Sequence, residues 1–168
     1  MGNASGLPER LSADDEQIFP NMTEYEVTSP RDATYNCIAF AAGDTARKWD
    51  PNMLLQPGYY WPPGALRDDG NNDINALKRA FEVLGYAECE HGDLEPGYQK
   101  VALYAVKDES WQHAALQDAI GNWVSKLGDE YDVRHKSPHC FEGSIYGKVA
   151  CFMKRRNVDA SEGIPSNQ

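Results

Sequence analysis

The feature that most constrains the fold is a short apolar run, KVALYAV at residues 100–106, which is bounded by the turn-forming stretches EPGYQ and KDES. Such a run fits a central β-strand, whose backbone groups need hydrogen-bonding neighbours. A hairpin through KDES would supply one neighbour from residues 111–120, WQHAALQDAI. The alanine and leucine content of residues 111–120 favours a helix, but the need of the apolar run for a partner favours a strand. We therefore expect a sheet built around residues 100–106.

Two stretches before this run are helical in pattern. Residues 36–48 are apolar and alanine-rich with Gly43 as the only breaker, which predicts a mostly buried helix of about three turns. Asp73 caps a second predicted helix, which ends before Gly85. Between the two helices, residues 57–73 are too rich in Pro and Gly for regular structure and predict a long loop. The apolar residues at helical spacing in the second helix are Ile74, Leu77, Phe81 and Leu84.

The later segments predict further strands. NWVSKLG at residues 122–128 and YGKVACFMK at residues 146–154 are rich in Val and aromatic residues, with Gly at their ends. Helices followed by strands, in a chain of 168 residues, predict a single α+β domain over residues 31–156. Residues 1–30 contain three prolines and an acidic run and predict a loosely ordered lead-in, and residues 157–168 predict a flexible tail.

Charge and apolar content exclude several classes of protein. A net charge of -10 opposes binding to nucleic acid, because phosphate contacts require Lys and Arg. The chain has no apolar run long enough to span a membrane, and its first residues lack the pattern of a signal peptide. We therefore expect a soluble protein with no membrane partner, either cytoplasmic or exported by a route that needs no signal peptide.

Four cysteines without CxxC spacing predict free thiols and not a disulfide framework. Cys89, His91, His135, His139 and Cys140 could be combined into a zinc site, but their spacing is irregular. A proline between His135 and His139 also prevents a shared helical face. The sequence predicts no metal and no cofactor.

Cys37 is the candidate nucleophile, because it stands at the start of the first predicted helix in TYNCIAFAAGDTARKW, residues 34–49. The positive potential of a helix N-terminus lowers the pKa of a thiol and raises its thiolate fraction. The alternative is a small apolar residue in the core, since free cysteine is among the most buried residue types. His113 is the candidate base, which would accept the thiol proton and later protonate a leaving amine.

A catalytic imidazole needs a third group that fixes its tautomer. Asp132 and His135 are candidates for that role, and Ser125 competes because it lies on the strand after His113. A solvated loop position is the alternative for each of them. The aromatic stretch YYWPP at residues 59–63, with Tyr60 and Trp61, would either wall a substrate groove or cover the edge of the core, and cover is the commoner role.

The order of these motifs resembles the papain-like superfamily, in particular its compact NlpC-type and CHAP-type amidases and peptidases. The motifs are an NC-x-A-x-A helix, a strand, a His that opens the next strand, and a polar residue beyond it. The resemblance implies a papain-like core in which the helix bearing Cys37 packs on an antiparallel sheet. It also implies that Cys37 and His113 cleave an amide or isopeptide bond in a peptide, a protein or a peptidoglycan-like substrate. Residues 34 to 155 also resemble an uncharacterised bacterial domain family.

The chain departs from the papain pattern before the nucleophile. The Gln that papain-type enzymes use in the oxyanion hole is missing, and Arg31 stands upstream of Cys37 instead. Asn36 or a backbone N–H would take that role, so Asn36, Tyr60 and Trp61 are the predicted substrate-binding residues. The alternative function is a binding module that keeps the scaffold without the chemistry, and a buried, inert Cys37 would favour it.

Overall fold

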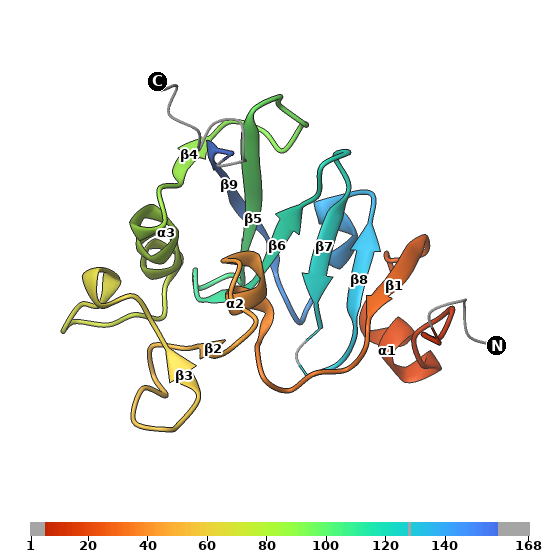
Figure 1. The fold of residues 1–168 in the computed structure, drawn as a ribbon, viewed down its shortest axis with the longest axis horizontal. Coiled ribbons are helices and arrows are strands. Elements are labelled where there is room, and N and C mark those ends of the chain that lie inside the picture. The colour runs from red at the N-terminus through yellow and green to blue at the C-terminus, as the bar shows by residue number, and fades with distance from the viewer. Residues whose placement is uncertain (1–5, 128, 158–168) are drawn as a thin grey trace, which may run out of the picture.

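A seven-stranded sheet is the centre of the fold in the computed structural model, which describes residues 6–127 and 129–157 (Figure 1). The strand order is β1-β8-β7-β6-β5-β9-β4, and each neighbouring pair is antiparallel. The mixture of helices with an antiparallel sheet confirms the α+β class. The strands are β1 (Tyr25–Ser29), β4 (Ala87–Cys89), β5 (Tyr98–Ala105), β6 (Trp111–Gln117), β7 (Trp123–Lys126), β8 (Asp132–His135) and β9 (Lys148–Arg156).

The apolar run at residues 100–106 forms most of β5, which lies between β6 and β9. Its residues 100–104 are fully buried, so the prediction of a central strand is confirmed. The turn at residues 107–110 joins β5 to β6, with Glu109 in the left-handed region at φ 66°. Residues 111–117 therefore form a strand and not the helix that their alanine content favours.

Two predicted helices are present, with different lengths. α3 (Ile74–Val83) begins where expected, and its cap Asp73 accepts a hydrogen bond from the amide of Ala76 at 3.0 Å. α2 (Cys37–Ala41) is much shorter than predicted, because Gly43 turns the chain at φ 87°. The intervening segment contains the short parallel strands β2 (Lys48–Trp49) and β3 (Tyr59–Tyr60) and the 3-10 helix η1 (Pro63–Ala65).

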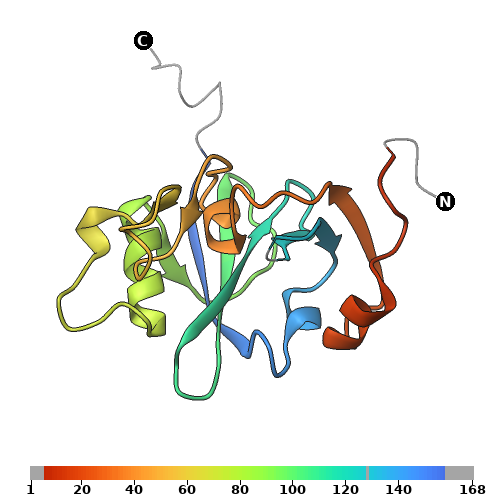
Figure 2. The same ribbon diagram turned by 90° about the horizontal axis from the view of Figure 1, so that it is seen from below.

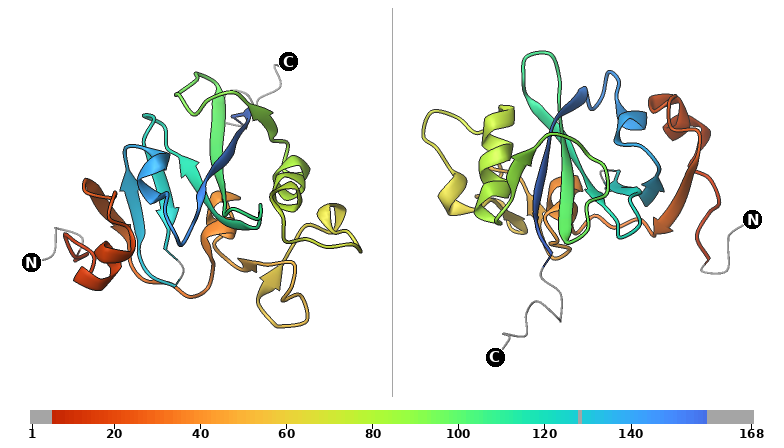
Figure 3. Two further views of the ribbon diagram at one scale, coloured as in Figure 1. Left: turned by 180° about the vertical axis from the view of Figure 1, so that it is seen from behind. Right: turned by 90° about the horizontal axis from the view of Figure 1, so that it is seen from above.

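The sheet carries one apolar cluster on each face, because successive side chains along a strand point to opposite sides. α2 and α3 lie on one face, and η2 (Pro138–Phe141) lies on the other with α1 (Ala13–Ile18) beside the sheet (Figures 2 and 3). We call these groups the helix-side cluster and the far-side cluster. The helix-side cluster includes Ile38, Leu77, Phe81, Val101, Leu103, Ala114 and Met153. The far-side cluster includes Leu11, Phe19, Ala102, Tyr104, Ala115, Trp123, Val133 and Phe141.

The N-terminal segment is part of the folded unit. Ser12 caps α1 by accepting from the amide of Asp15, and β1 pairs with β8 at the edge of the sheet. Leu11 and Phe19 are buried in the far-side cluster. The prediction of a loosely ordered lead-in is therefore wrong for residues 6–30, because the apolar residues between the prolines find a face of the sheet to cover. Residues 1–5 and the predicted tail from residue 158 lie outside the described residues.

Two β-bulges meet at the same point of β5. In the pairing with β6, Tyr104 faces His113 and Ala105 faces Trp111, so Gln112 is the extra residue. In the pairing with β9, Leu103 faces Cys151 and Tyr104 faces Val149, so Ala150 is the extra residue. A bulge redirects side chains and frees backbone groups from the ladder. None of the helices in the described part of the chain has the length and apolar character that a membrane span requires.

Candidate functional site

Three buried polar side chains from neighbouring strands form a hydrogen-bonded chain. His113 lies on β6, Ser125 on β7 and His135 on β8, and each is at most 1% exposed. The Ser125 Oγ atom is 3.0 Å from His113 Nε2 and 2.9 Å from His135 Nε2. His135 Nδ1 is 2.9 Å from the carbonyl oxygen of Ser137. Of the three predicted orienting residues, Ser125 is the one that contacts His113 directly.

The direction of these hydrogen bonds fixes the tautomers. A carbonyl oxygen can only accept, so His135 Nδ1 carries a proton and its Nε2 is an acceptor. The Ser125 hydroxyl then donates to His135 Nε2 and accepts from His113 Nε2. His113 Nδ1 is left without a proton, and this buried atom has no hydrogen-bond partner among the described residues. The chain of contacts therefore presents a free lone pair on His113.

Aromatic rings surround the His113 imidazole. The Tyr146 ring stacks on it with a centroid distance of 4.0 Å and an interplanar angle of 4°. Tyr104 and Phe141 lie at 5.0 Å and 5.7 Å, and both belong to the far-side cluster. Burial, and to a smaller extent repulsion from His135 when that ring is protonated, holds the pKa of His113 well below its usual 6.5. The imidazole is neutral at neutral pH.

Cys37 begins α2 and lies against the bulge beside His113. Asn36 caps the helix by accepting from the amide of Ala39 at 3.0 Å. The Cys37 thiol donates to the carbonyl oxygen of Gln112, with 4.0 Å between Sγ and O. The backbone amide of Ala114 also interacts with the sulfur. The thiol thus contacts the backbone on both sides of His113.

Burial dominates the electrostatics of Cys37. It raises the pKa of the thiol to about 11, although the amides of Ala114, Ile38 and Cys37 itself favour the thiolate. The amides at the helix N-terminus favour the thiolate as predicted, but burial outweighs them, so the net shift of this pKa is upward and not downward. A helix of five residues supplies few aligned dipoles, and the loss of solvent outweighs them.

The Cys37 thiol contacts the backbone beside His113, and among the described residues it forms no hydrogen bond with the imidazole itself. Cys37 packs against the helix-side cluster, whereas the His113 ring contacts the far-side cluster. The Tyr146 ring stacks on His113, and burial, followed by the charge of a Cys37 thiolate, raises the pKa of its hydroxyl. Sequence reasoning did not select Tyr146, which comes from a loop far along the chain with no motif to mark it.

Asp132 is not an orienting residue for His113. Its Oδ2 atom accepts a hydrogen bond from the Tyr35 hydroxyl at 3.0 Å, and its Oδ1 atom is 4.0 Å from Lys126 Nζ. Burial raises the pKa of Asp132 and lowers the pKa of Lys126. This part of the prediction is wrong because neighbouring positions on β8 point to opposite faces of the sheet, so Asp132 and His135 serve different networks.

The predicted substrate-binding residues have structural contacts. Trp61 is 2% exposed and stacks on Trp111 with a centroid distance of 5.6 Å, so it covers the core. Tyr60 lies beneath the Arg47 guanidinium, whose central carbon is 3.7 Å from the ring centroid. Asn36 is occupied by the cap of α2. No group of three or more His, Cys, Asp or Glu within the described residues is arranged to hold a metal ion.

Three cavities of about 900, 500 and 610 Å³ open on the surface, and none of these three is lined by Cys37 or His113. Residues 26–154 match the sequence model of the family described as Domain of unknown function (DUF7689). The chain belongs to this family. The matched range of the DUF7689 domain contains Cys37 and the whole His113–Ser125–His135 chain, and it begins within β1, after α1. No curated protein and no solved structure matches the chain.

Proposed function

We propose that the chain is a cysteine hydrolase of papain-like type, in which Cys37 is the nucleophile and Nδ1 of His113 is the general base. One observation carries this proposal: the contacts of His113 leave Nδ1 without a proton or a partner, while the Cys37 thiol contacts the backbone on both sides of the same residue. Ser125 and His135 are positioning residues, because they hold the tautomer that a base requires.

The proposed reaction follows from the resting protonation states. Because the pKa of Cys37 is about 11, the thiol enters the reaction protonated, and its proton moves to His113 Nδ1 as sulfur attacks the carbonyl carbon of an amide. Collapse of the tetrahedral intermediate breaks the C–N bond, and the leaving nitrogen takes the proton from Nδ1. Water then attacks the thioester, gives a proton to Nδ1, and releases the carboxylic acid as that proton returns to sulfur.

A binding module on the same scaffold is the second candidate. It is favoured by the complete burial of His113, by the stacked Tyr146 ring, and by the position of the three cavities away from Cys37. On this alternative the polar chain has a structural role only. The two candidates differ in whether the imidazole accelerates reactions of the thiol.

Rates of alkylation by iodoacetamide at pH 7, followed by mass spectrometry of the separate peptides, test the choice. Cys151 is the matched control, because burial also raises its pKa to about 11 and it is likewise half-buried. We expect Cys37 to react on the order of 10²-fold faster than Cys151, since a positioned base contributes at least that factor. His113→Asn should remove the difference, and Ser125→Ala should reduce it while the imidazole remains.

Circular dichroism establishes that each variant is folded before rates are compared. Equal alkylation of Cys37 and Cys151 in the unmodified protein would reject Cys37 as an activated nucleophile and leave the binding module as the function. A rate at Cys37 that survives in folded His113→Asn would lead to the same conclusion.

A further inference from the structure

Lys126 and Asp132 form a buried pair of ionisable groups that the proposed hydrolase reaction does not use. They are directly opposite each other on the antiparallel strands β7 and β8, and their side chains are 0% and 2% exposed. Side chains at directly opposite positions lie on the same face of a sheet, with Cβ atoms about 4.5–5.5 Å apart. The Lys126 Nζ atom is 4.0 Å from Asp132 Oδ1. The backbone of two strands therefore holds an amine beside a carboxyl group.

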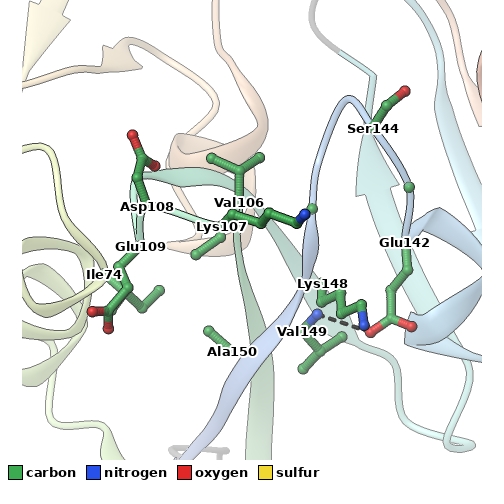
Figure 4. A pocket seen from close by; sticks show the side chains of 13 residues that line it. Ile74, Val106, Lys107, Asp108, Glu109, Glu142, Ser144, Lys148, Val149 and Ala150 are labelled. Carbon is green, nitrogen blue, oxygen red and sulfur yellow. Dashed lines mark hydrogen bonds between the residues drawn. The ribbon is translucent and has the colours of Figure 1, made fainter.

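Protein encloses this pair. The largest of the three cavities lies between the β5–β6 turn and the loop before β9 (Figure 4), and neither Lys126 nor Asp132 lines it or the other two. Tyr35, which is 6% exposed, packs on the amine, with Nζ 4.9 Å from the ring centroid. The amine and the carboxyl group thus meet where water is excluded.

The hydrogen bonds of the pair leave one carboxyl oxygen open. Asp132 Oδ2 accepts from the Tyr35 hydroxyl at 3.0 Å, whereas Oδ1 has no hydrogen-bond partner among the described residues. The Lys126 amine donates to the carbonyl oxygen of Glu130. A separation of 4.0 Å between Nζ and Oδ1 is too long for a hydrogen bond. The carboxyl group is therefore fixed through Oδ2 and open on the side that faces the amine.

Burial favours the uncharged forms of both groups. Loss of solvent is the largest cause of the raised pKa of Asp132 and of the lowered pKa of Lys126. The attraction between the two charges acts in the opposite direction and is weaker. Transfer of one proton from the ammonium to the carboxylate converts the ion pair into a neutral amine and a carboxylic acid. These are the forms in which an amine attacks a carboxyl carbon.

We propose that Lys126 and Asp132 condense to an intramolecular isopeptide bond in the folded chain. Nζ attacks Cγ of the protonated Asp132 carboxyl group, and the new N–C bond forms. The Tyr35 hydroxyl stabilises the negative charge that develops on Oδ2. The bond between Cγ and Oδ1 then breaks, and Oδ1 leaves as water with its own proton and one proton from Nζ. The reaction needs no oxidant and no second substrate.

Placement of the two groups favours the condensation. Reacting groups held in a productive orientation behave as if present at roughly 10⁵–10⁸ M. In water an amine and an acid are both ionised and do not condense, and burial removes that obstacle here. The proposal goes beyond the hydrolase activity and does not depend on it, since Cys37 and His113 contribute no atom to the bond. In chains that carry the bond, Asp132 and Lys126 no longer titrate.

Lys100 and Glu95 provide a control within the same chain. Lys100 is also fully buried, and its Nζ atom is closer to a carboxylate, at 3.3 Å from Glu95 Oε1. Glu95 is 32% exposed, and a hydrogen bond from Lys154 is the largest cause of its lowered pKa, so this carboxylate stays ionised. An ionised carboxylate resists attack by an amine. We therefore expect no bond at Lys100, although its carboxylate is nearer.

Tryptic digestion of the full chain, followed by mass spectrometry, tests the proposal. Trypsin does not cleave after a lysine whose amine is part of an amide, so the bond should give one peptide of residues 108–134 that is lighter by one water. Further cleavage after Glu130 should leave its two pieces connected, which a succinimide at an aspartate would not do. We expect this linked peptide to be the major product after prolonged incubation of the folded chain at neutral pH. A chain kept in urea should instead be cleaved after Lys126, because only the fold brings the two groups together.

Variants and chemistry identify the bond. Lys126→Met and Asp132→Ala, shown to be folded by circular dichroism, should each abolish the water loss, and trypsin should cleave the unmodified protein fully after Lys100. Hydroxylamine cleaves thioesters, esters and succinimides, and it should leave the linked peptide unchanged. Complete cleavage after Lys126 in the folded, incubated chain would overturn the proposal, as would a water loss that persists in either folded variant or that hydroxylamine reverses. The readout is a covalent bond, so the result is the same whether or not Cys37 is a nucleophile.

Discussion

At the scale of single residues, burial decides the charge of the groups that matter. The pKa of Cys37 rises to about 11, the pKa of His135 falls to about 4, and the pKa of His113 falls well below 6.5, and in each case loss of solvent is the largest cause. All three side chains are therefore uncharged at neutral pH. Hydrogen bonds, and not ion pairs, hold the site together.

The neutral histidines predict a pH-dependent stability. Both bind a proton in the unfolded chain near pH 6.5 but not in the folded protein, so the unfolded state takes up more protons as the pH falls. The two neutral histidines contribute fully to the free energy of unfolding above pH 6.5, and this contribution is lost progressively as the pH falls below 6.5. Between pH 7 and pH 5 we expect the free energy of unfolding to fall by about 2 kcal/mol for each histidine. Urea unfolding at pH 7, 6 and 5 measures this change.

Substitutions identify which histidines are responsible. His135→Gln should remove about half of the pH dependence, because it removes one of the two buried, neutral histidines. Asp132 changes the free energy of unfolding in the opposite direction. Burial raises its pKa, so the protonated carboxyl stabilises the folded protein at low pH, and this stabilisation is lost as the pH rises through the raised pKa. A stability that is constant between pH 7 and pH 5 would contradict the assignment of neutral histidines.

At the scale of elements, hydrogen bonds from side-chain caps fix the positions of the short helices relative to the strands. Asn36 is the clearest case, because it connects α2 to β2 as well as capping the helix. Its Oδ1 atom accepts from the amides of Ala39 at 3.0 Å and Trp49 at 3.1 Å, and its Nδ2 atom donates to the carbonyl oxygen of Trp49 at 3.0 Å. The position of Cys37 at the bulge of β6 depends on these contacts.

We expect Asn36→Ala to lower the free energy of unfolding by about 2 kcal/mol, because it removes a helix cap and leaves backbone groups of Trp49 without partners. Asn36→Asp should cost less, since a carboxylate keeps the acceptor and loses only the Nδ2 donor. Asn52→Ala serves as an exposed control, as the Asn52 side chain donates only to Asn72 at the surface. Urea unfolding measures all three, and a loss at Asn36→Ala no larger than at Asn52→Ala would contradict this role.

Local sequence pattern predicted some elements and not others. α3 and β5 followed from helical spacing with a capping Asp73 and from a bounded apolar run. The length of α2 did not follow, because Gly43 adopts a left-handed conformation that composition alone does not require. The strand at residues 111–117 could be predicted only from its pairing with β5, because the alanine content of these residues by itself favours a helix.

The candidate site was predictable only in part for a related reason. Cys37 and His113 could be selected by residue type, and the structure does bring α2 against β6. The tautomer of His113 depends on Ser125 in β7, and on His135 in β8 with the carbonyl of Ser137 that follows it. No spacing along the chain encodes such a contact, so the choice between Ser125 and Asp132 could not be made from sequence.

At the scale of the whole molecule, the sheet is covered on both faces, and the N-terminal segment covers part of the far side. The family match begins at residue 26, yet Leu11, Phe19 and Met22 before it are buried in the far-side cluster. That cluster contains the rings that enclose His113. The segment before the matched range therefore belongs to the same cooperative unit as the candidate site.

This continuity predicts different effects for two adjacent residues. Phe19 is 8% exposed, and its ring centroid lies 4.9 Å from that of Phe141 and 5.0 Å from that of Tyr146, whereas Ile18 is 45% exposed. Phe19→Ala should lower the free energy of unfolding by about 3 kcal/mol through lost burial and a cavity, and Ile18→Ala should lower it by less than about 1 kcal/mol. Both are measured by urea unfolding of the full chain, followed by circular dichroism. Similar small losses of unfolding free energy at the two positions would show that the N-terminal segment folds separately from the sheet. Removal of the Phe19 ring destabilises the whole domain only if the segment is packed on the far-side cluster.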